Sequence, residues 1–277
     1  MGVSVSQISS FSSRSTRTVS RAIHQYLDHP PKPEPKPNSA CHLIIDGTWF
    51  KKKENCAVVY WDPSLGRVQW WRYSTGEKVF EIVEDLRKLK EAGVICSSIT
   101  SDGGLGIIRA VQRVYPDIPH QRCVVHLQRD ARRFVTQRPR LDAGKELSPL
   151  IPRLSNIETH EEKDQWIRDF EDWSHRWEQF LKRRSSGFTD DGQPISWFTH
   201  KQLRRADVSI KNAIPNLFHY LDDPNIPRTS NGLEGRFSSF KQHYRQHRGL
   251  SKSRREGYIA WYLRVVVNGE SPTRNVH

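Results

Sequence analysis

The sequence of 277 residues lacks any long hydrophobic run. No apolar stretch approaches the length of roughly 20 residues that a membrane-spanning helix needs. A mean hydropathy of −0.73 also argues against a membrane protein. The first residues are rich in Ser with scattered Arg but lack the apolar segment of a secretory signal. A transit peptide has a similar composition and stays a less favoured alternative. With 35% apolar residues, the chain can still build a core.

Cysteine is scarce, with four residues in the whole chain. Cys41, Cys56, Cys96 and Cys123 are widely spaced, and no two of them form a CxxC pair. The spacing argues against a zinc knuckle and against a disulfide framework. It favours a reduced setting, which for this chain we expect to be cytoplasmic and associated with the nucleoid.

Acidic residues are in short supply relative to basic ones. Lys and Arg number 44 against 31 Asp and Glu, which gives a formal net charge of +13. Such a positive field favours a polyanionic partner, and nucleic acid is the obvious one. The alternative is a basic protein without such a partner, so charge alone does not decide the matter.

The N-terminal segment, residues 1–28, contains two short helical patterns separated by a Ser-rich turn. Their proportions match the last two helices of a helix-turn-helix, and Arg17 and Arg21 lie off the apolar side of the second helix, where they could contact DNA. A plain helical hairpin is the alternative. A complete unit needs one more helix, which leaves a truncated N-terminus as one interpretation. Residues 29–40 alternate Pro with charge and predict a semi-rigid linker and a domain boundary.

From Cys41 onward, the pattern predicts an α/β domain. Alternating and apolar stretches indicate antiparallel strands, then a helix, a strand, a second helix, and a segment that is either a strand or the start of the next helix. The ranges, in that order, are 41–50, 55–62 and 67–73, then 77–92, 94–100, 105–115 and 120–126. This order is the one expected for a ribonuclease-H-like mixed sheet.

The pattern changes after Arg129, where β-branched runs give way to charged, Trp-rich helical stretches. We therefore predict an all-helical insertion at 129–227 between two parts of the core, 41–128 and 228–268, with a tail at 269–277. Trp166, Trp173 and Trp177 are spaced as one side of a helix. They are interpreted as core residues in preference to a platform for a flipped base.

Three acidic residues occupy distinctive contexts: Asp46 after an apolar run and expected at the end of the first strand, Asp102 at the end of the fourth strand, and Glu234 on a later helix. In the expected fold the two strands are neighbours, so both aspartates emerge at one edge and Glu234 can close the site. Clustered carboxylates repel one another unless cations hold them, which predicts a magnesium site. Two ions about 3.5–4 Å apart would serve phosphodiester chemistry, with Mn²⁺ able to substitute. For each acid alone, a common turn or a solvated helix residue is the favoured explanation, and the prediction rests on all three acids together in a strongly basic chain.

Two further patterns surround these acids. Cys123 and His126 have a spacing that can share a metal on a helix, but the sequence offers no second pair of ligands, so a locally packed Cys and His is the better explanation. The segment after Glu234 is basic, and cations there could clamp DNA and offset charge in the transition state. These candidate DNA-binding residues are Arg236, Lys241, Arg245 and Arg248. A solvated basic helix is the simpler alternative.

The segments DGTWF (46–50), residues 101–129 and residues 229–249 together resemble the bacterial insertion-sequence transposases of the Mutator-like group. The resemblance implies a ribonuclease-H-like core whose Asp-Asp-Glu triad is Asp46, Asp102 and Glu234. It also implies a Cys/His motif at Cys123 and His126 and a helical insertion before the Glu. It covers most of residues 41–250, and several motifs agree in order and context. It further implies a homodimer or higher oligomer acting on paired DNA ends.

The leading hypothesis is therefore a magnesium-dependent DNA transposase that cleaves the ends of a transposable element and joins them to target DNA. One alternative is a ribonuclease-H-like nuclease that cuts without joining. Another is a transposase-derived DNA-binding protein or inactive remnant. We expect DNA as the partner and no association with a membrane.

Overall fold

The computed structural model describes residues 3–38, 40–51, 55–245 and 249–270. It is a mixed α/β structure that divides into two compact units. We call them the sheet unit, residues 1–99, 104–118 and 230–277, and the helical unit, residues 100–103 and 119–229. Among the described helices, none is both long and apolar enough to cross a membrane.

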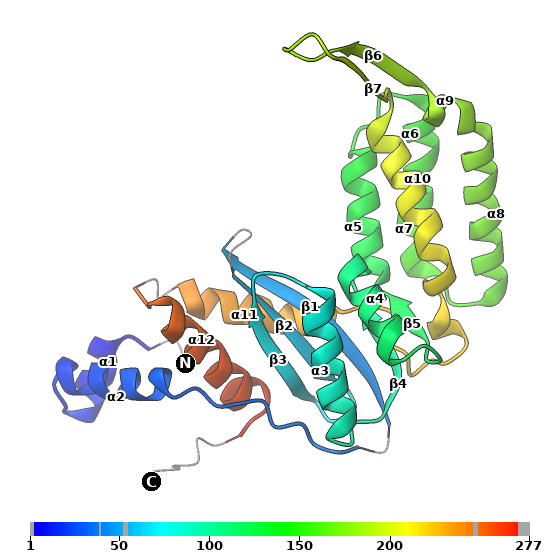
Figure 1. The fold of residues 1–277 in the computed structure, drawn as a ribbon. Helices are drawn as coiled ribbons and strands as arrows, with labels where there is room; N and C mark the ends of the chain where they lie inside the picture. Colours follow the sequence, from blue (N-terminus) through cyan, green and yellow to red (C-terminus); the bar gives the residue numbers. More distant parts are fainter. Residues whose placement is uncertain (1–2, 39, 52–54, 246–248, 271–277) are drawn as a thin grey trace. The chain divides into compact units, whose positions relative to one another are not determined.

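The strands form a five-stranded sheet in the order β3-β2-β1-β4-β5 (Figure 1). Their bounds are Cys41–Lys51 (β1), Asn55–Asp62 (β2), Arg67–Ser74 (β3), Cys96–Ser101 (β4) and His120–Arg122 (β5). β1, β2 and β3 are antiparallel, with Asp46 opposite Val59 and Val59 opposite Trp71. The predicted strands are confirmed. The segment at 120–126, which the sequence predicted as either a strand or the start of a helix, contains both. Strand β5 comes first, and helix α5 (Val124–Val135) begins after it.

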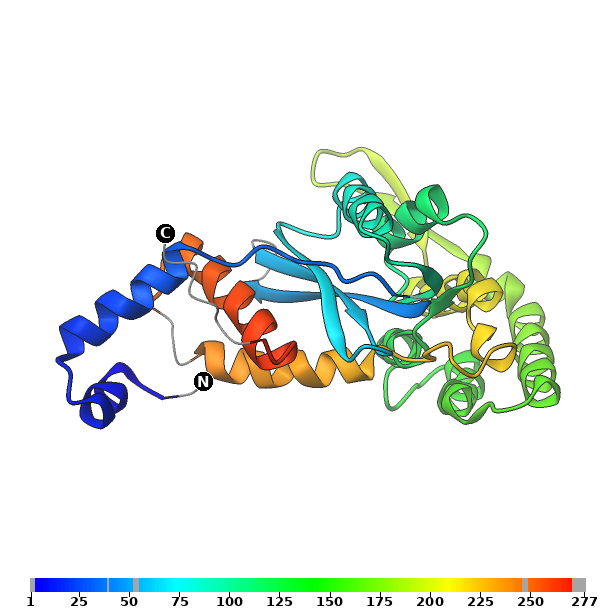
Figure 2. The same ribbon diagram turned by 90° about the horizontal axis from the view of Figure 1, so that it is seen from below.

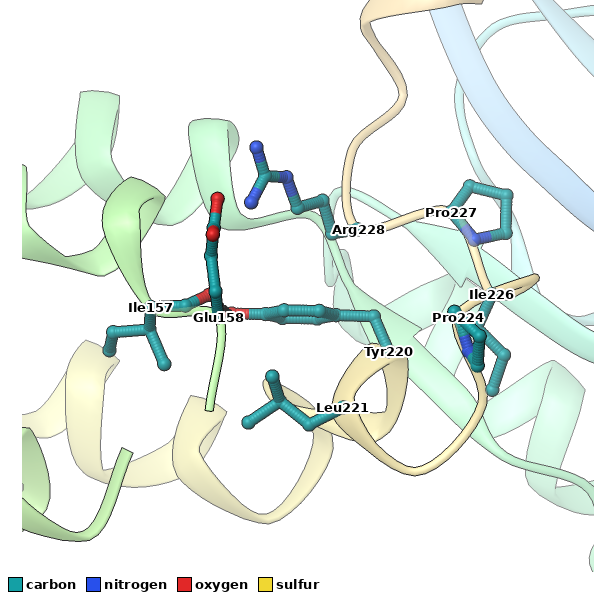
Figure 3. Close-up of a pocket in the computed structure, with 8 residues that line it drawn as sticks. All are labelled: Ile157, Glu158, Tyr220, Leu221, Pro224, Ile226, Pro227 and Arg228. Atoms are coloured by element: carbon teal, nitrogen blue, oxygen red, sulfur yellow. Dashed lines mark hydrogen bonds between the residues drawn. The ribbon is translucent and has the colours of Figure 1, made fainter. Parts of the chain in front are cut away.

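In the sheet unit, helices cover both faces of the sheet (Figure 2). α3 (Val79–Glu91) and α4 (Leu105–Val114) pack on one face, and α11 (Asn231–Arg245) and α12 (Lys252–Trp261) pack on the other. A π-helical turn, Tyr262–Val267, continues α12. Side chains alternate along a strand, so Leu43 and Ile45 join the core with α3 and α4, and Ile44 joins the core with α11 and α12.

The two N-terminal helices, α1 (Val5–Ser12) and α2 (Thr16–Asp28), belong to the sheet unit. The guanidinium of Arg254 donates two hydrogen bonds to the Asp28 carboxylate, at 2.8 and 3.0 Å. The indole of Trp261 donates to the carbonyl of Tyr26 at 2.7 Å. Gly257 has no Cβ, and one placed there would collide with the backbone of Leu27. α2 is therefore held closely against α12.

The Pro-rich segment 29–38 is also fixed to the sheet unit and does not separate two compact units. The Lys36 amide donates to the Gln69 side chain at 2.8 Å, and Gln69 donates back to the Lys36 carbonyl at 3.2 Å. Asn38 bridges the Asp62 carboxylate and the amide of Ile95. Extended polyproline backbone makes no internal hydrogen bonds, so its polar groups are available to such distant partners.

The helical unit is built around one apolar core. Its remaining helices are α6 (Asp142–Leu147), α7 (Leu150–Arg153), α8 (His160–Arg176), α9 (Glu178–Lys182) and α10 (Lys201–Ala213), with short 3-10 turns at 154–156, 214–216 and 219–221. Trp166 and Trp173 are buried, and their indoles donate to the carbonyls of Leu150 and Ala143. Trp177 packs against the same core. These three tryptophans are core residues, as predicted.

The prediction of an all-helical insertion was wrong, because residues 184–198 form a β-hairpin. β6 (Arg184–Phe188) and β7 (Pro194–Phe198) pair antiparallel around a turn at 189–193. Gly192 adopts φ +76°, which a residue with a side chain rarely takes. An Asp-Gly pair at a turn is a strong hairpin signal, so Asp191-Gly192 was the sequence feature that could have revealed it.

Candidate active site

Asp46 lies in the middle of β1, and its side chain is 5% exposed. By the alternation of strand side chains, it shares a face with Ile44 and Phe50. Phe50 contacts Phe240 and Tyr244 of α11, with ring centroids 5.3 Å apart in both pairs. Asp46 therefore faces the side of the sheet that α11 covers.

Glu234 lies in the first turn of α11 and is half-buried. An acid is favourable there because the helix dipole is positive at its N-terminus. β1 and α11 run in the same direction (Figures 1 and 2). Asp46 and Glu234 thus belong to the same side of the sheet within the sheet unit, the side that α11 covers.

Asp102 directly follows β4 and belongs to the helical unit. It is half-buried and precedes Gly103, which has φ +81° and donates its amide to the Ser101 hydroxyl at 3.2 Å. A Cβ at Gly103 would lie 2.7 to 2.9 Å from the guanidinium end of Arg122. Burial lowers the pKa of Arg122, while the charges of Asp130 and Asp102 act in the opposite direction. Arg122 is thus a cation close to Asp102.

Cys123 is buried immediately before α5, and His126 is half-buried in the first turn of that helix. The Cys123 amide donates to the Ser101 carbonyl at 2.7 Å, and the Val124 amide donates to the Arg228 carbonyl at 3.1 Å. The start of α5 is therefore fastened beside the end of β4. In the part of the chain that the structure describes, no group of three or more His, Cys, Asp or Glu side chains is arranged to hold a metal ion.

The basic candidates of the sheet unit lie on two helices. On α11, Arg236 and Arg245 are exposed and Lys241 is half-buried, and the Arg236 guanidinium lies 4.1 Å from the centre of the Trp61 ring. On α2, Arg17 and Arg21 are exposed and one helical turn apart. Arg248 falls outside the described residues. The structure thus leaves solvent access to Arg17, Arg21, Arg236 and Arg245.

Sequence reasoning missed four polar side chains near the candidate acids in the chain or in the fold. Arg122 packs under Gly103, as described above. Thr48 lies two residues after Asp46 on the same face of β1, is 3% exposed, and its hydroxyl has no hydrogen-bond partner among the described residues. Ser101 and His120 form a buried pair, with Oγ and Nε2 2.8 Å apart. No local signal marks these residues, because strand pairing and packing place them.

The buried His120 predicts a pH-dependent stability. Burial, followed by the charges of His219 and Arg122, lowers the pKa of His120 to about 4, against 6.5 in an unfolded chain. At a pH between about 4 and 6.5, this histidine therefore binds a proton in the unfolded chain but stays neutral in the folded chain. Stability from this group is present above pH 6.5 and is lost as the pH falls toward 4, by about 3 kcal/mol.

We expect His120→Gln to flatten this dependence in thermal unfolding measured between pH 7 and pH 4.5. His175→Gln, which replaces an exposed histidine on α8, is the matched control and should keep the wild-type slope. Parallel slopes for wild type and His120→Gln would contradict the prediction.

Comparison with known proteins identifies the class. The family described as "Transposase, Mutator family" matches residues 75–217, just over half of the chain. The chain therefore belongs to the Mutator family of transposases, as the sequence motifs predicted. The match contains Asp102, Cys123 and His126, while Asp46 and Glu234 lie on either side of it.

No curated protein matches the chain. Among solved structures, it is similar to a chain in a cryo-EM structure of the simian T-cell lymphotropic virus intasome in complex with PP2A regulatory subunit B56 gamma. The identity is 14%, the alignment covers 56% of this chain and 70% of that chain, and the TM-score is 0.23.

Proposed function

We propose that this protein is a DNA transposase that cleaves the ends of a transposable element and transfers the cleaved strand to target DNA. Membership of the Mutator family carries the proposal. The catalytic residues would be Asp46, Asp102 and Glu234. Support for this set comes from the common face of Asp46 and Glu234 in the sheet unit, and from the position of Asp102 immediately after β4, the strand next to β1.

We further propose that the sheet unit is a ribonuclease-H-like core. Three antiparallel strands come first in the chain, and β4 then joins the sheet beside β1. This order is the one expected for that fold. It delivers the acid in β1 and the acid after β4 from neighbouring strands.

Carboxylate oxygens are the hard ligands that Mg²⁺ prefers, so the chemistry of the proposed residues suits this ion, while their described side chains are not gathered into a metal site. The buried Thr48 hydroxyl adds a further oxygen on the face of β1 that carries Asp46. Bound Mg²⁺ or Mn²⁺ would supply the Lewis acidity that phosphodiester cleavage needs. Asp46, Asp102 and Glu234 would hold it, and Arg122 would orient the Asp102 carboxylate.

The basic residues would position the DNA. Lys241 lies two helical turns beyond Glu234 on the same side of α11, where a cation can contact a phosphate next to the scissile bond. Arg236 and Arg245 extend this basic surface, and α2 would present Arg17 and Arg21 to DNA in the manner of a recognition helix. We expect a homodimer or higher oligomer to act on paired ends.

The test is nicking of supercoiled plasmid by the purified chain, followed by strand transfer from pre-cleaved element ends. We expect nicking with Mg²⁺ or Mn²⁺, its loss with a chelator, and joined products in the second assay. Nicking without joining would identify a nuclease. Absence of nicking with either ion, together with retained DNA binding, would identify a DNA-binding derivative and refute the proposal.

A further inference from the structure

The β6–β7 hairpin of the helical unit presents large apolar side chains to solvent. Phe188 is 76% exposed, Trp197 45% and Ile195 41%. The hairpin extends beyond the ends of α8 and α10 within this unit (Figure 1). An isolated two-stranded ribbon is marginal in water, and exposed apolar groups on one indicate a binding surface.

One face of the ribbon carries an open tryptophan. Trp197 is opposite Ser185, and Ile195 is opposite Gly187, so these four residues share a face. A Cβ at Gly187 would lie 3.1 and 3.3 Å from atoms of the Trp197 ring. The absence of that atom leaves room for the edge of the indole beside β6, and Trp197 remains 45% exposed. An exposed indole offers a surface on which a nucleic-acid base can stack.

The other face carries a preorganised cationic cluster. The guanidinium groups of Arg184 and Arg204 lie 4.8 and 4.0 Å from the centre of the Phe198 ring. Arg184 also donates to the hydroxyl and the carbonyl of Ser196, at 2.8 and 3.1 Å. Stacking, and for Arg184 hydrogen bonding, hold these two guanidinium groups against the ribbon, where they add to its positive charge.

The charge around the hairpin favours a polyanion. Residues 182–205 contain six Lys and Arg against two acids, and both acids, Asp190 and Asp191, are in the turn. Arg183, Lys201 and Arg205 are exposed at the base of the ribbon. Lys182 instead pairs with Glu178 at 2.6 Å. These cations therefore lie at the base of the ribbon, where they could contact the backbone of a nucleic acid.

The remaining tryptophans of α8 and its C-terminal end do not offer this surface. Trp166 and Trp173 are 1% and 3% exposed, and Trp177 donates to Glu146 at 3.0 Å while packing on the core. Trp197 is the tryptophan of the helical unit that combines high exposure with a glycine opposite its ring edge. It is thus suited to stack with a base.

We propose that the β6–β7 hairpin binds DNA with unpaired bases, with a base stacked on Trp197 and phosphates on Arg183, Lys201 and Arg205. The identity of the nucleic acid as DNA rests on the proposed function. The interaction does not depend on the catalytic triad. The hairpin would hold a DNA strand whose bases have become unpaired because the duplex was opened or cut, as transposition requires.

The experiment measures the affinity of the full chain for a labelled single strand of about 20 nucleotides and for the matching duplex, by fluorescence anisotropy at several salt concentrations. We expect Trp197→Ala to weaken single-strand binding about tenfold, with a smaller change for the duplex. Trp197→Phe should retain most of the affinity. Gly187→Val should weaken it while keeping the tryptophan, because the added Cβ displaces the ring. Phe80→Ala, at a 66% exposed aromatic of the sheet unit, is the control and should bind as wild type.

The phosphate contacts have a separate signature. Lys201→Ala and Arg205→Ala should each lower the slope of log affinity against log salt by about 0.7 for the single strand, while Trp197→Ala should leave that slope unchanged. If the hairpin had only a structural role, the tryptophan variant and the two cation variants would not differ in the salt dependence of their affinity.

Wild-type single-strand affinity in Trp197→Ala would overturn the proposal. So would unchanged DNA binding combined with a loss of self-association in sedimentation, since the hairpin would then contact a second copy of the chain. If Trp197→Ala weakens binding but the wild-type chain never nicks DNA, the proposed function fails and this inference stands.

Discussion

Asp102→Asn is expected to lower the rate of plasmid nicking by at least about 10³-fold, which corresponds to about 4 kcal/mol of transition-state stabilisation. Asparagine keeps the size of the side chain but removes the negative charge that would hold a divalent cation. Asp46→Asn and Glu234→Gln should have the same effect for the same reason. The measurement is the initial rate of nicking of supercoiled plasmid with Mg²⁺.

DNA binding separates a catalytic loss from a folding defect. Removal of an acid near phosphates should leave the affinity for DNA unchanged or slightly higher, because a repulsive charge is lost. Asp117→Asn changes an exposed aspartate of the sheet unit and should nick at the wild-type rate. Wild-type nicking by any one of the three acid variants would remove that residue from the catalytic set.

Asp85→Ala is expected to destabilise the sheet unit by about 3–5 kcal/mol, the usual cost of breaking a buried ion pair from one side. Asp85 is fully buried on α3 and accepts hydrogen bonds from the Tyr60 hydroxyl at 3.0 Å, the Trp70 indole at 2.8 Å and the Arg72 guanidinium at 2.6 to 2.9 Å. Burial and the charge of Asp85 raise the pKa of Tyr60 well above its usual value. Removal of the carboxylate leaves the Tyr60 hydroxyl and the Trp70 indole without this acceptor, and leaves Arg72 with the exposed Glu84 carboxylate.

The neighbouring residue supplies a matched control. Glu84 contacts the same Arg72 at 2.8 Å, but its side chain is 51% exposed, and solvent screens such a pair. Glu84→Ala should therefore change stability little. Urea unfolding, together with hydrogen exchange of β2 and β3, measures the effect within the sheet unit. Equal losses of stability in the two variants would show that burial of the carboxylate does not determine how strongly it stabilises the fold.

Local periodicity accounts for the elements that could be predicted. The strands at 41–50, 55–62 and 67–73 and the helix at 77–92 follow from alternating or 3.6-residue spacing, which a short window contains in full. The hairpin at 184–198 was missed because its residues are mostly exposed, so no alternation of apolar and polar residues marks its strands. Only the Asp191-Gly192 pair pointed to it.

Long-range hydrogen bonding explains why the linker was misjudged. The Pro and charge pattern of residues 29–40 correctly excludes a helix, but it says nothing about partners that are 24 to 57 residues away. Gln69, Asp62 and Ile95 supply those partners. As a result, α1 and α2 are part of the sheet unit.

By itself, the sequence determined the Mutator family, the strand and helix order of the core, and the acids and cations proposed for catalysis, because motifs and periodicity are local properties. The tertiary structure alone decided which way Asp46 faces. The sequence shows that side chains alternate along the strand, but only the packed helices show what lies on each face of the sheet. The tertiary structure also decided that Arg122 lies against Gly103, and that Trp197 is open while Trp166 and Trp173 are buried. The exposure of a side chain depends on which other residues pack against it, and many of those residues are distant in sequence.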